Sequence, residues 1–413
     1  MPTRRIFLKN SALAMIGVGV LPTWLARSAY ASEAGGRKKI LVAIFQRGAV
    51  DGLNVVVPYG EQVYYKLRPT IAVPRNQLLD LDGFFGFHPA LAPLKPLWDQ
   101  GHLAAIHATG SPDPTRSHFD AQDYMESGTP GLKATDDGWL NRALRSENRG
   151  IPAADRSPVR AVAMGAQVPL TLQGRAPAVA INNLSAFRIT QGQSPVDSGF
   201  EAMYDHAQDA LLQPAGQDTF AALHLLRQLD PKSYQPAPGA DYPNAPLGQS
   251  LRQLAQIIKA DVGVEVAFAD VGGWDHHVNE GGAQGQLANN LRQFAAALAA
   301  FWADLGPRQQ DVVLVTMSEF GRTVHENGNR GTDHGHANVM FTLGGEVRGG
   351  KVYGNWPGLG GNQLYQDRDL AVTTDFRTVL AEAVARHLGV ADLGNVFPGY
   401  TADPAQFRGW LAG

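Results

Sequence analysis

The sequence predicts an α/β fold whose central sheet is mainly parallel and covered on both faces. Two apolar runs, Lys39–Phe45 and Val312–Met317, have the length and the β-branched composition of fully buried strands. Between Val264 and Met317 the chain passes from a strand to a polar cluster, then to a helix and a second strand. This order is typical of parallel strands joined by right-handed crossovers.

The first 31 residues have the pattern of an export signal. Paired arginines after Thr3 precede an apolar stretch from Ser11 to Ala26, and Ala29-Tyr-Ala31 offers a small-residue cleavage site. The arginine pair resembles a twin-arginine signal, a route that exports folded proteins, often with their cofactor installed. The apolar stretch contains glycines and a proline and is shorter than the roughly 18 residues of a membrane span. We therefore expect a periplasmic or secreted protein, a transient partner of the twin-arginine export machinery, with no stable membrane span after maturation.

Composition excludes several classes of function. Without the 31-residue signal, 382 residues remain, with 31 Lys and Arg (35 minus four) against 38 Asp and Glu, so the net charge is −7. The only basic run left is Arg37–Lys39, which argues against nucleic acid as a partner. Cysteine is absent, which excludes disulfides and thiolate ligands. We expect one domain over residues 32–413 with a cap or insert around 185–247, because the proline-rich stretch 230–246 has little periodicity.

The loop after the first strand carries Arg47 and Asp51. A charged loop at the carboxyl end of a buried strand is where open α/β sheets place their ligands. Asp51 is therefore a candidate metal ligand. Because Gly52 follows it, an Asp-Gly turn accounts for the same residues equally well.

A second strand, Leu103–Ala108, leads to Ser117 at the predicted start of a helix. Unpaired N–H groups and the helix dipole favour an anion at this position, and also a hydroxyl that attacks one. The alternative is that Ser117 only caps the helix. Arg116 and His118 flank it, and a cap requires neither.

Two further polar clusters follow later strands. Asp275 and His277 come after the strand Val264–Ala269 and could offer a carboxylate and an imidazole to one ion. A larger set stands before the apolar run Val339–Leu343 and comprises Glu319, Arg322, Asp333, His334 and His336. Burying such groups is costly unless a metal ion or an ion-pair network pairs with them. A solvated Asp-His-Gly-His turn with Gly at positive φ, and a strand-end ion pair of Glu319 with Arg322, remain open alternatives.

The rest of the chain supplies covering helices and outer strands. Periodicity predicts helices at 88–98, 199–212, 220–229, 249–259 and 286–305, and strands at 159–164 and 178–181. The segment 59–86 predicts surface loops with a short helix.

Five motifs, in this order behind the twin-arginine pattern, resemble the bacterial domain-of-unknown-function 1501 family: FQRGAVDGLN, RSHFDAQDYMESG, GGWDHHVNEG, SEFGRT and GTDHGHAN. The resemblance covers nearly the whole mature chain. That family is placed in the alkaline-phosphatase and sulfatase-like superfamily. The resemblance therefore implies a three-layer α/β/α sandwich with a metal centre at the carboxyl ends of the strands, here with irregular cap insertions. Substrates of the family are not generally established, so the resemblance indicates the fold more firmly than the reaction.

The resemblance also implies roles for individual residues. Asp51 matches a metal ligand after the first strand, Ser117 is the nearest match to a hydroxyl nucleophile, and Asp275 with His277 resembles the pair that holds one ion. The remaining ligands by similarity are Glu319, Asp333, His334 and His336. Glu319 departs from the usual Asp-His, and no sulfatase-type Cys/Ser-x-Pro-x-Arg signature is present, so we do not expect a formylglycine sulfatase.

Together these residues predict an exported, metal-dependent hydrolase of a small phosphate or sulfate ester. One or two divalent ions would neutralise the ester and activate Ser117 or a water molecule; histidine ligands favour zinc or manganese, and carboxylates alone would favour calcium or magnesium. His118 would protonate the leaving group or position the nucleophile. The residues expected to clamp the non-bridging oxygens are Arg47, Arg116 and Arg322. The alternative is an exported binding or assembly protein that keeps the fold without turnover.

Overall fold

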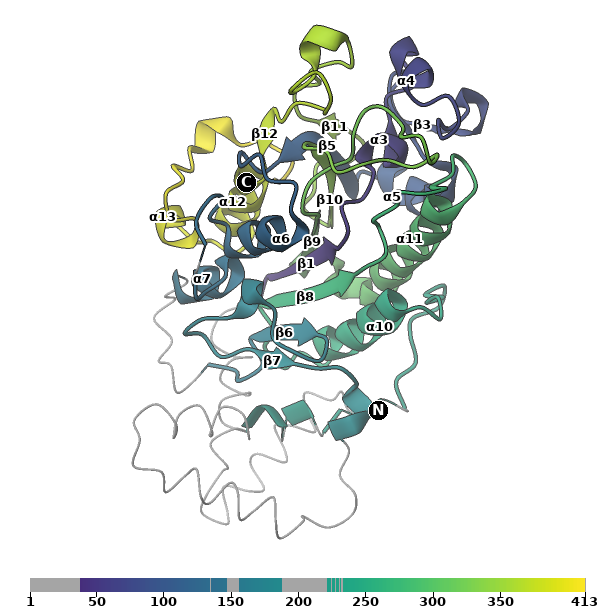
Figure 1. Ribbon diagram of the computed structural model, residues 1–413. Helices are drawn as coiled ribbons and strands as arrows, with labels where there is room; N and C mark the ends of the chain where they lie inside the picture. The colour runs from purple at the N-terminus through teal and green to yellow at the C-terminus, as the bar shows by residue number, and fades with distance from the viewer. Residues whose placement is uncertain are drawn as a thin grey trace, which may run out of the picture.

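The computed structural model describes residues 38–412 apart from 134, 147–155, 188–220, 224, 227, 230 and 232. Its helices lie on the two sides of one central sheet, which gives the three-layer α/β/α arrangement that the family resemblance implies (Figure 1). The predicted signal lies outside the described residues, as do the predicted helix at 199–212 and much of the predicted insert at 185–247.

The central sheet has nine strands in the order β11-β5-β10-β9-β1-β8-β6-β7, with β12 paired to β5. Their bounds are β1 Ile40–Gln46, β5 Leu103–Gly110, β6 Ala161–Met164, β7 Val179–Ala180, β8 Val266–Val271, β9 Val312–Met317, β10 Asn338–Gly344, β11 Val352–Tyr353 and β12 Thr374–Asp375. β1 is parallel to β8 and β9, and β6 to β7 and β8, whereas β10 is antiparallel to both β5 and β9. The sheet is mainly parallel, as predicted, and β10 is reversed.

Helices pack on both faces of the sheet. One face is covered by α10 Pro246–Lys259, α11 Gln286–Leu305 and the short α5 Lys95–Asp99. The other is covered by α6 His118–Ser127, α7 Trp139–Ser146, α12 Phe376–Arg386 and α13 Leu393–Val396. No helix in the described part of the chain has the length and apolarity needed to cross a membrane.

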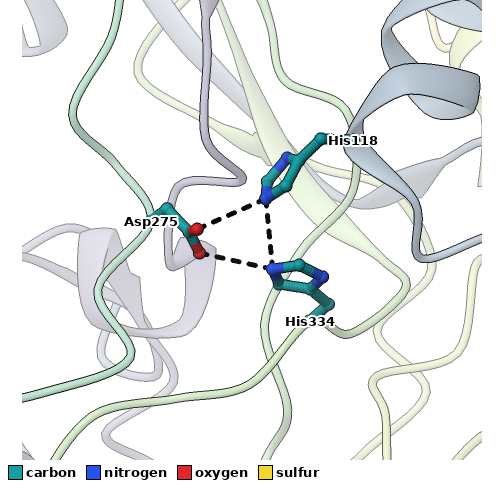
Figure 2. Close-up of side chains that lie close together, drawn as sticks. All are labelled: His118, Asp275 and His334. Carbon is teal, nitrogen blue, oxygen red and sulfur yellow. Dashed lines mark hydrogen bonds and ion pairs between the residues drawn. The ribbon is translucent and has the colours of Figure 1, made fainter.

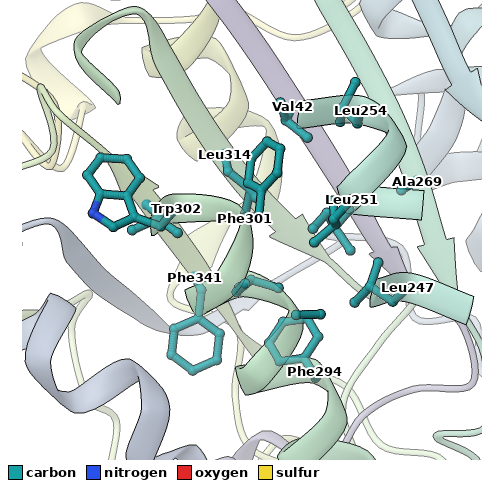
Figure 3. Packing of buried hydrophobic residues seen from close by; sticks show 14 of the residues in the cluster. Val42, Leu247, Leu251, Leu254, Ala269, Phe294, Phe301, Trp302, Leu314 and Phe341 are labelled. Carbon is teal, nitrogen blue, oxygen red and sulfur yellow. The ribbon is translucent and has the colours of Figure 1, made fainter. Parts of the chain in front are cut away.

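The central strands read as unbroken apolar runs because successive side chains enter opposite cores. In β1, Val42 and Ile44 pack on the face of α10 and α11, while Ala43 and Phe45 pack on the other face. Figure 3 shows the first of these cores, in which Phe301 of α11 lies among side chains from the sheet and from α10. Because both faces of the sheet are buried, the strands hold the loops that follow them in fixed positions.

Smaller elements complete the fold around residues 52–94. Helices α3 Gly52–Val55 and α4 Gln62–Leu67 accompany a three-stranded sheet of β2 Val56–Val57, β3 Leu79–Asp80 and β4 Gly86–Phe87. The sequence predicts only loops and a short helix here, because two-residue strands leave no measurable period. The 3₁₀ turns are η1 Arg75–Gln77, η2 Pro89–Leu94, η4 Leu170–Leu172, η5 Leu184–Phe187, η6 Gly306–Asp311, η7 Gly361–Gln363 and η8 Pro404–Gln406.

Candidate metal centre

One edge of the sheet collects the polar residues that the sequence singles out. The parallel strands β1, β5, β8 and β9 end at this edge, and the reversed strand β10 begins there. Four loops therefore meet: 47–51 after β1, 111–117 after β5, 272–280 after β8, and 318–337 between β9 and β10.

Three imidazoles and one carboxylate converge at this edge. The Nε2 atom of His334 lies 3.1 Å from that of His118 and 3.0 Å from that of His277. Asp275 Oδ1 lies 2.9 Å from His277 Nε2 and 3.3 Å from His334 Nε2, and its Oδ2 lies 3.5 Å from His118 Nε2. Figure 2 shows His118, at the start of α6, and the loop residues Asp275 and His334 pointing toward one another. We call His118, Asp275, His277 and His334 the histidine–aspartate cluster.

In each of the three imidazoles the other ring nitrogen contacts an oxygen acceptor. His334 Nδ1 donates to the Arg116 carbonyl at 2.9 Å, because a carbonyl can only accept. His277 Nδ1 lies 3.1 Å from Asp333 Oδ1, and His118 Nδ1 lies 3.3 Å from Glu319 Oε1. An imidazole that donates through Nδ1 presents the lone pair of Nε2. The Nε2 atoms of His118 and His277 therefore both lie beside that of His334.

This donor set fits one divalent ion. Neutral Nε2 atoms about 3 Å apart with no proton between them repel unless a cation lies between, and four ligands about 2.0–2.1 Å from a tetrahedral zinc are about 3.3 Å apart. His118, Asp275 and His334 offer ligand atoms that lie within 4.8 Å of one another. Among the described residues this is the one such group of three or more. The geometry therefore supports one ion and gives no support for a second.

The charges around the cluster keep its carboxylate ionised. Arg322 is buried and donates through Nη1 to Asp275 Oδ1 at 2.7 Å. Although burial acts to raise it, the pKa of Asp275 is lowered by Arg322 and by the nearby histidines. Burial lowers the pKa of His334, whereas the hydrogen bond to Glu319 raises the pKa of His118. Arg322 is thus engaged with Asp275 through Nη1, while its buried Nη2 has no partner among the described residues.

Glu319 links the loop after β1 to helix α6 instead of joining the cluster. Its Oε1 accepts from Gly48 N at 2.8 Å and from Gln122 Nε2 at 2.6 Å, and its Oε2 accepts from Ala49 N at 2.9 Å. Gly48 and Ala49 have φ of 115° and 58°, and a side chain on Gly48 would come within 2.9 Å of Asp275 N. Burial acts to raise the pKa of Glu319, but His118 and these N–H donors lower it. The structure thus places Glu319 behind His118, as a buried anion that fixes the loop after β1.

Asp51 lies in a separate, fully buried ion pair. Its Oδ1 accepts from Arg68 Nη2 at 3.0 Å, and its Oδ2 contacts Arg68 Nη1. Arg68 also donates to Asn54 Oδ1 and to the carbonyls of Thr323 and Val324. Because both Asp51 oxygens face a guanidinium, the structure does not bring this predicted ligand into the cluster.

Two other predicted ligands have other partners. Asp333 accepts from His277 and from Asn327 Nδ2 at 3.1 Å, so it lies behind the cluster as Glu319 does. His336 Nε2 lies 3.0 Å from the Ser111 carbonyl, its Nδ1 is buried with no partner among the described residues, and burial lowers its pKa. The solvated-turn alternative for Asp-His-Gly-His is wrong: Gly335 is outside the positive-φ region, and a Cβ there would lie 2.3 Å from the Arg322 backbone.

Ser117 is the N-cap residue of α6, as predicted, but its side chain makes no cap hydrogen bond. Its backbone carbonyl accepts from Ala121 N at 2.9 Å, which starts the helix. Ser117 is half-buried and immediately precedes His118. Its hydroxyl is therefore not occupied by a cap bond, and its neighbour in the sequence belongs to the cluster.

The other two predicted clamps bind protein groups. Every nitrogen-bearing arm of Arg47 has a partner, since Nε, Nη1 and Nη2 donate to Asp270, Gln122 and Glu126. Arg116 donates to Asp369 Oδ2 and to Gln366 Oε1. The guanidinium of Arg47 is fully engaged by protein groups, whereas the side chain of Arg116 is 27% exposed to solvent.

Sequence reasoning assigned His118 to proton transfer, but the structure groups it with the other imidazoles. The signal was available, since His118 begins the helix that follows a strand-end loop, and His277 and His334 stand in such loops. Arg68 could not be found this way, because it lies in an irregular segment and its partner Asp51 is 17 residues away.

The family model described as "Protein of unknown function (DUF1501)" matches residues 98–399, most of the chain. The chain belongs to this family. The resemblance carried by the five motifs is therefore confirmed, and all four members of the histidine–aspartate cluster lie inside the matched span. No curated protein matches the chain.

Solved structures with similar chain paths include phosphoryl and sulfuryl enzymes. The C-terminal periplasmic domain of EcEptC from Escherichia coli, in complex with Zn, is 12% identical over 76% of this chain and 74% of its own, with a TM-score of 0.34. The PsFucS1 sulfatase from Pseudoalteromonas sp. is 10% identical over 90% and 71%, with a TM-score of 0.41. The phosphonate monoester hydrolase of Agrobacterium radiobacter is 10% identical over 88% and 78%, with a TM-score of 0.34. With TM-scores below 0.5, these likenesses carry no weight for the activity of this chain.

Proposed function

We propose that this DUF1501 chain is a metal-dependent hydrolase of a phosphate or sulfate ester, and that His118, Asp275, His277 and His334 hold one divalent ion. A single observation carries the proposal. His334 Nε2 lies within 3.1 Å of the Nε2 atoms of His118 and His277 and 3.3 Å from Asp275 Oδ1, and each imidazole contacts an oxygen through its other nitrogen. Oxygen partners of this kind orient and strengthen histidine ligands.

The donor set favours zinc, with manganese as a second choice. Imidazole nitrogens suit zinc, whereas calcium and magnesium prefer sites made only of oxygens. A bound ion would supply Lewis-acid polarisation of the ester and charge neutralisation at the reacting oxygens. Arg322, buried beneath Asp275, holds that carboxylate ionised and oriented toward the ion.

Ser117 is the residue we propose as nucleophile. It precedes the ligand His118, its hydroxyl makes no cap bond, and it stands at the N-terminus of a ten-residue helix. The helix dipole stabilises negative charge that develops on the hydroxyl or on the ester. Because His118 is bound through both ring nitrogens in this arrangement, proton transfer to the leaving group is not assigned to it.

A second candidate is an exported binding protein that keeps the ion without turnover. It is favoured by the engagement of Arg47 and Arg322 with protein carboxylates, which removes two of the three arginines expected to clamp an ester. Export itself is part of both proposals and rests on the twin-arginine pattern. Replacing both arginines by lysine, in the double variant Arg4→Lys with Arg5→Lys, should leave the protein in the cytoplasm, as measured by cell fractionation.

The two candidates separate in one experiment. The full mature chain is loaded with zinc or manganese, its metal content is measured by elemental analysis, and phosphomonoesters, phosphodiesters and sulfate esters are offered in turn. A hydrolase should bind about one ion and turn over one of these classes, with activity lost on chelation and restored by the ion. Bound metal without turnover of any class would favour the binding protein. Absence of metal, with no thermal shift, would remove both; an ion at about 100 times its Kd should stabilise the fold by about 2.7 kcal/mol.

A further inference from the structure

Two arginines share one carboxylate next to the histidine–aspartate cluster. Arg116 donates to Asp369 Oδ2 through Nε at 3.0 Å and Nη2 at 2.5 Å, and Arg368 Nη1 lies 3.7 Å from the same oxygen. Asp369 is fully buried, and its Oδ1 has no partner among the described residues. One carboxylate therefore balances only one of the two guanidinium charges.

Both arginine residues form hydrogen bonds with His334, a proposed metal ligand. The Arg116 carbonyl accepts from His334 Nδ1 at 2.9 Å, and Arg368 Nη2 donates to the His334 carbonyl at 2.9 Å. The arginine pair is thereby fixed against one ligand from two directions. A molecule whose ester binds at the cluster would have the pair within reach of another of its groups.

The turn that presents Arg368 is held in a conformation that its sequence disfavours. Gln366 and Asp367 have φ of 55° and 54°, although neither is glycine. The turn is closed by Tyr365 N, which donates to the Asp369 carbonyl at 2.8 Å, and by Asp369 N, which donates to the Tyr365 carbonyl at 3.0 Å. Consecutive residues of this kind persist where the surrounding structure fixes them, and such positions cluster at functional sites.

The pair is open to solvent while its carboxylate is not. The side chains of Arg116 and Arg368 are 27% and 39% exposed, against 0% for Asp369. Arg47 and Arg322 differ, since their donors are bound to protein groups or buried. Burial acts to raise the pKa of Asp333, but the hydrogen bonds from Asn327 and His277, and to a smaller extent the charge of Arg368, lower it. The excess positive charge of the pair therefore faces outward.

We propose that Arg116 and Arg368 form an anion-binding subsite that holds a second negatively charged group of the substrate, a carboxylate, sulfate or phosphate separate from the reacting ester. Guanidinium groups match such oxyanions with paired N–H donors. This role as a substrate subsite rests on the proposed function. Binding of an oxyanion to the pair does not.

The test uses inorganic phosphate and sulfate as probes of the full mature chain, with titration calorimetry at low ionic strength. In protein stripped of metal by a chelator, either oxyanion should bind at about one per chain, and the affinity should fall as salt is added. Arg368→Gln should weaken this binding about tenfold or more, because a charge-assisted hydrogen bond is lost. Arg368→Lys should weaken it less. Arg145→Gln is the matched control, since Arg145 is also 39% exposed and ion-paired, with Asp137, and it should bind as the parent does.

The outcomes separate this subsite from the metal centre. Asp275→Asn, which removes a proposed metal ligand, should leave oxyanion binding in the stripped protein unchanged. If phosphate and sulfate bind only to metal-loaded protein, or if Arg368→Gln and Arg145→Gln bind equally well, the pair is only a clamp on Asp369 and the subsite is overturned. Melting curves of each variant identify any that is unfolded, in which case Arg368→Lys carries the test. A protein that binds oxyanions here but hydrolyses no ester would keep the subsite and lose the proposed function.

Discussion

Two charged clusters lie at the same edge of the sheet and differ in burial and in whether they contain their own counter-charge. The Asp51–Arg68 pair is fully buried, and every arm of its guanidinium donates to a protein oxygen. The histidine–aspartate cluster is partly open, with Asp275 42% exposed. Its three imidazoles present lone pairs rather than protons to one another. The first cluster contains its own cation, whereas the second is the one that we propose binds an ion from solution.

The boundary between the clusters is a chain of hydrogen bonds. Arg322 holds Asp275 through Nη1 and donates through Nε to Thr332 Oγ1 at 3.1 Å, and Thr332 in turn donates to Glu280 Oε2 at 2.8 Å. Burial and the adjacent Asp51 raise the pKa of Glu280 well above its ordinary value. A charged cluster whose groups all have partners within the protein stabilises the fold. A cluster whose groups lack such partners can bind an ion.

The largest expected effect comes from removing a proposed ligand. Asp275→Asn or His334→Ala should abolish turnover by several orders of magnitude and weaken metal binding by more than about 100-fold, since loss of an outer partner alone costs 10- to 100-fold. Competition with a chromogenic chelator measures the affinity. Asp403→Asn, at the N-cap of η8, where asparagine also caps, is the control and should behave as the parent. Unchanged metal binding in both ligand variants would mean that the cluster is not the metal site.

The opposite result is expected for the inner cluster. Arg68→Met leaves the buried Asp51 without its counter-charge, so the free energy of unfolding should fall by about 3–5 kcal/mol. Urea denaturation of metal-free protein measures it, and the exposed Arg75→Met is the matched control. Metal stoichiometry should stay at about one ion. If Arg68→Met instead released the ion at little cost in stability, Asp51 would belong with the metal ligands as the superfamily pattern implies.

The difference between the clusters also shows which features could be predicted from the sequence and which could not. β9 and α11 have the predicted bounds, because an unbroken β-branched apolar run and a long helical segment are strong sequence signals. Four strand-end loops were predicted to carry the polar residues, and the structure brings those loops together. Which side chain meets which was not predictable, since Asp51 and Asp275 stand in similar loops and differ only in whether Arg68 or three imidazoles face them. The reversal of β10 also escaped prediction, because an apolar run carries no direction.

Glu319 is buried like the Asp51–Arg68 pair but contacts His118 of the histidine–aspartate cluster. The contribution of its charge to stability can be tested by varying the pH. Its pKa is lowered in the folded protein, so its ionised form stabilises the fold above its ordinary value of 4.5. That contribution is lost as the pH falls through the lowered pKa. Glu319→Gln should therefore cost about 2 kcal/mol of unfolding free energy at neutral pH, the scale of hydrogen bonds to a charged group. The cost should shrink in acid, as followed by denaturation at several pH values. A cost independent of pH would show that the carboxylate charge is not what matters.

Asp333 should have a smaller effect, confined to the metal. It supports His277 from behind and is itself 53% exposed, so its loss should disturb a ligand without removing one. Asp333→Ala should weaken metal binding about 10- to 100-fold. Asp333→Asn should weaken it less, because the amide oxygen can still accept from His277 Nδ1. Equal loss in both variants would point to direct ligation by the carboxylate.

The smallest effect on stability, and the sharpest on chemistry, is expected at Ser117. A capping serine replaced by alanine costs typically about 1 kcal/mol. Since the Ser117 hydroxyl makes no cap bond, Ser117→Ala should cost well below that, and Ser117→Asp should be tolerated because aspartate suits a helix N-terminus. Both variants should keep the ion at the histidine–aspartate cluster while turnover of the identified ester is lost, as measured by metal analysis, melting and initial rates together. If Ser117→Ala retains most of the activity while Asp275→Asn and His334→Ala lose it, Ser117 is not the nucleophile. A water molecule must then attack in its place.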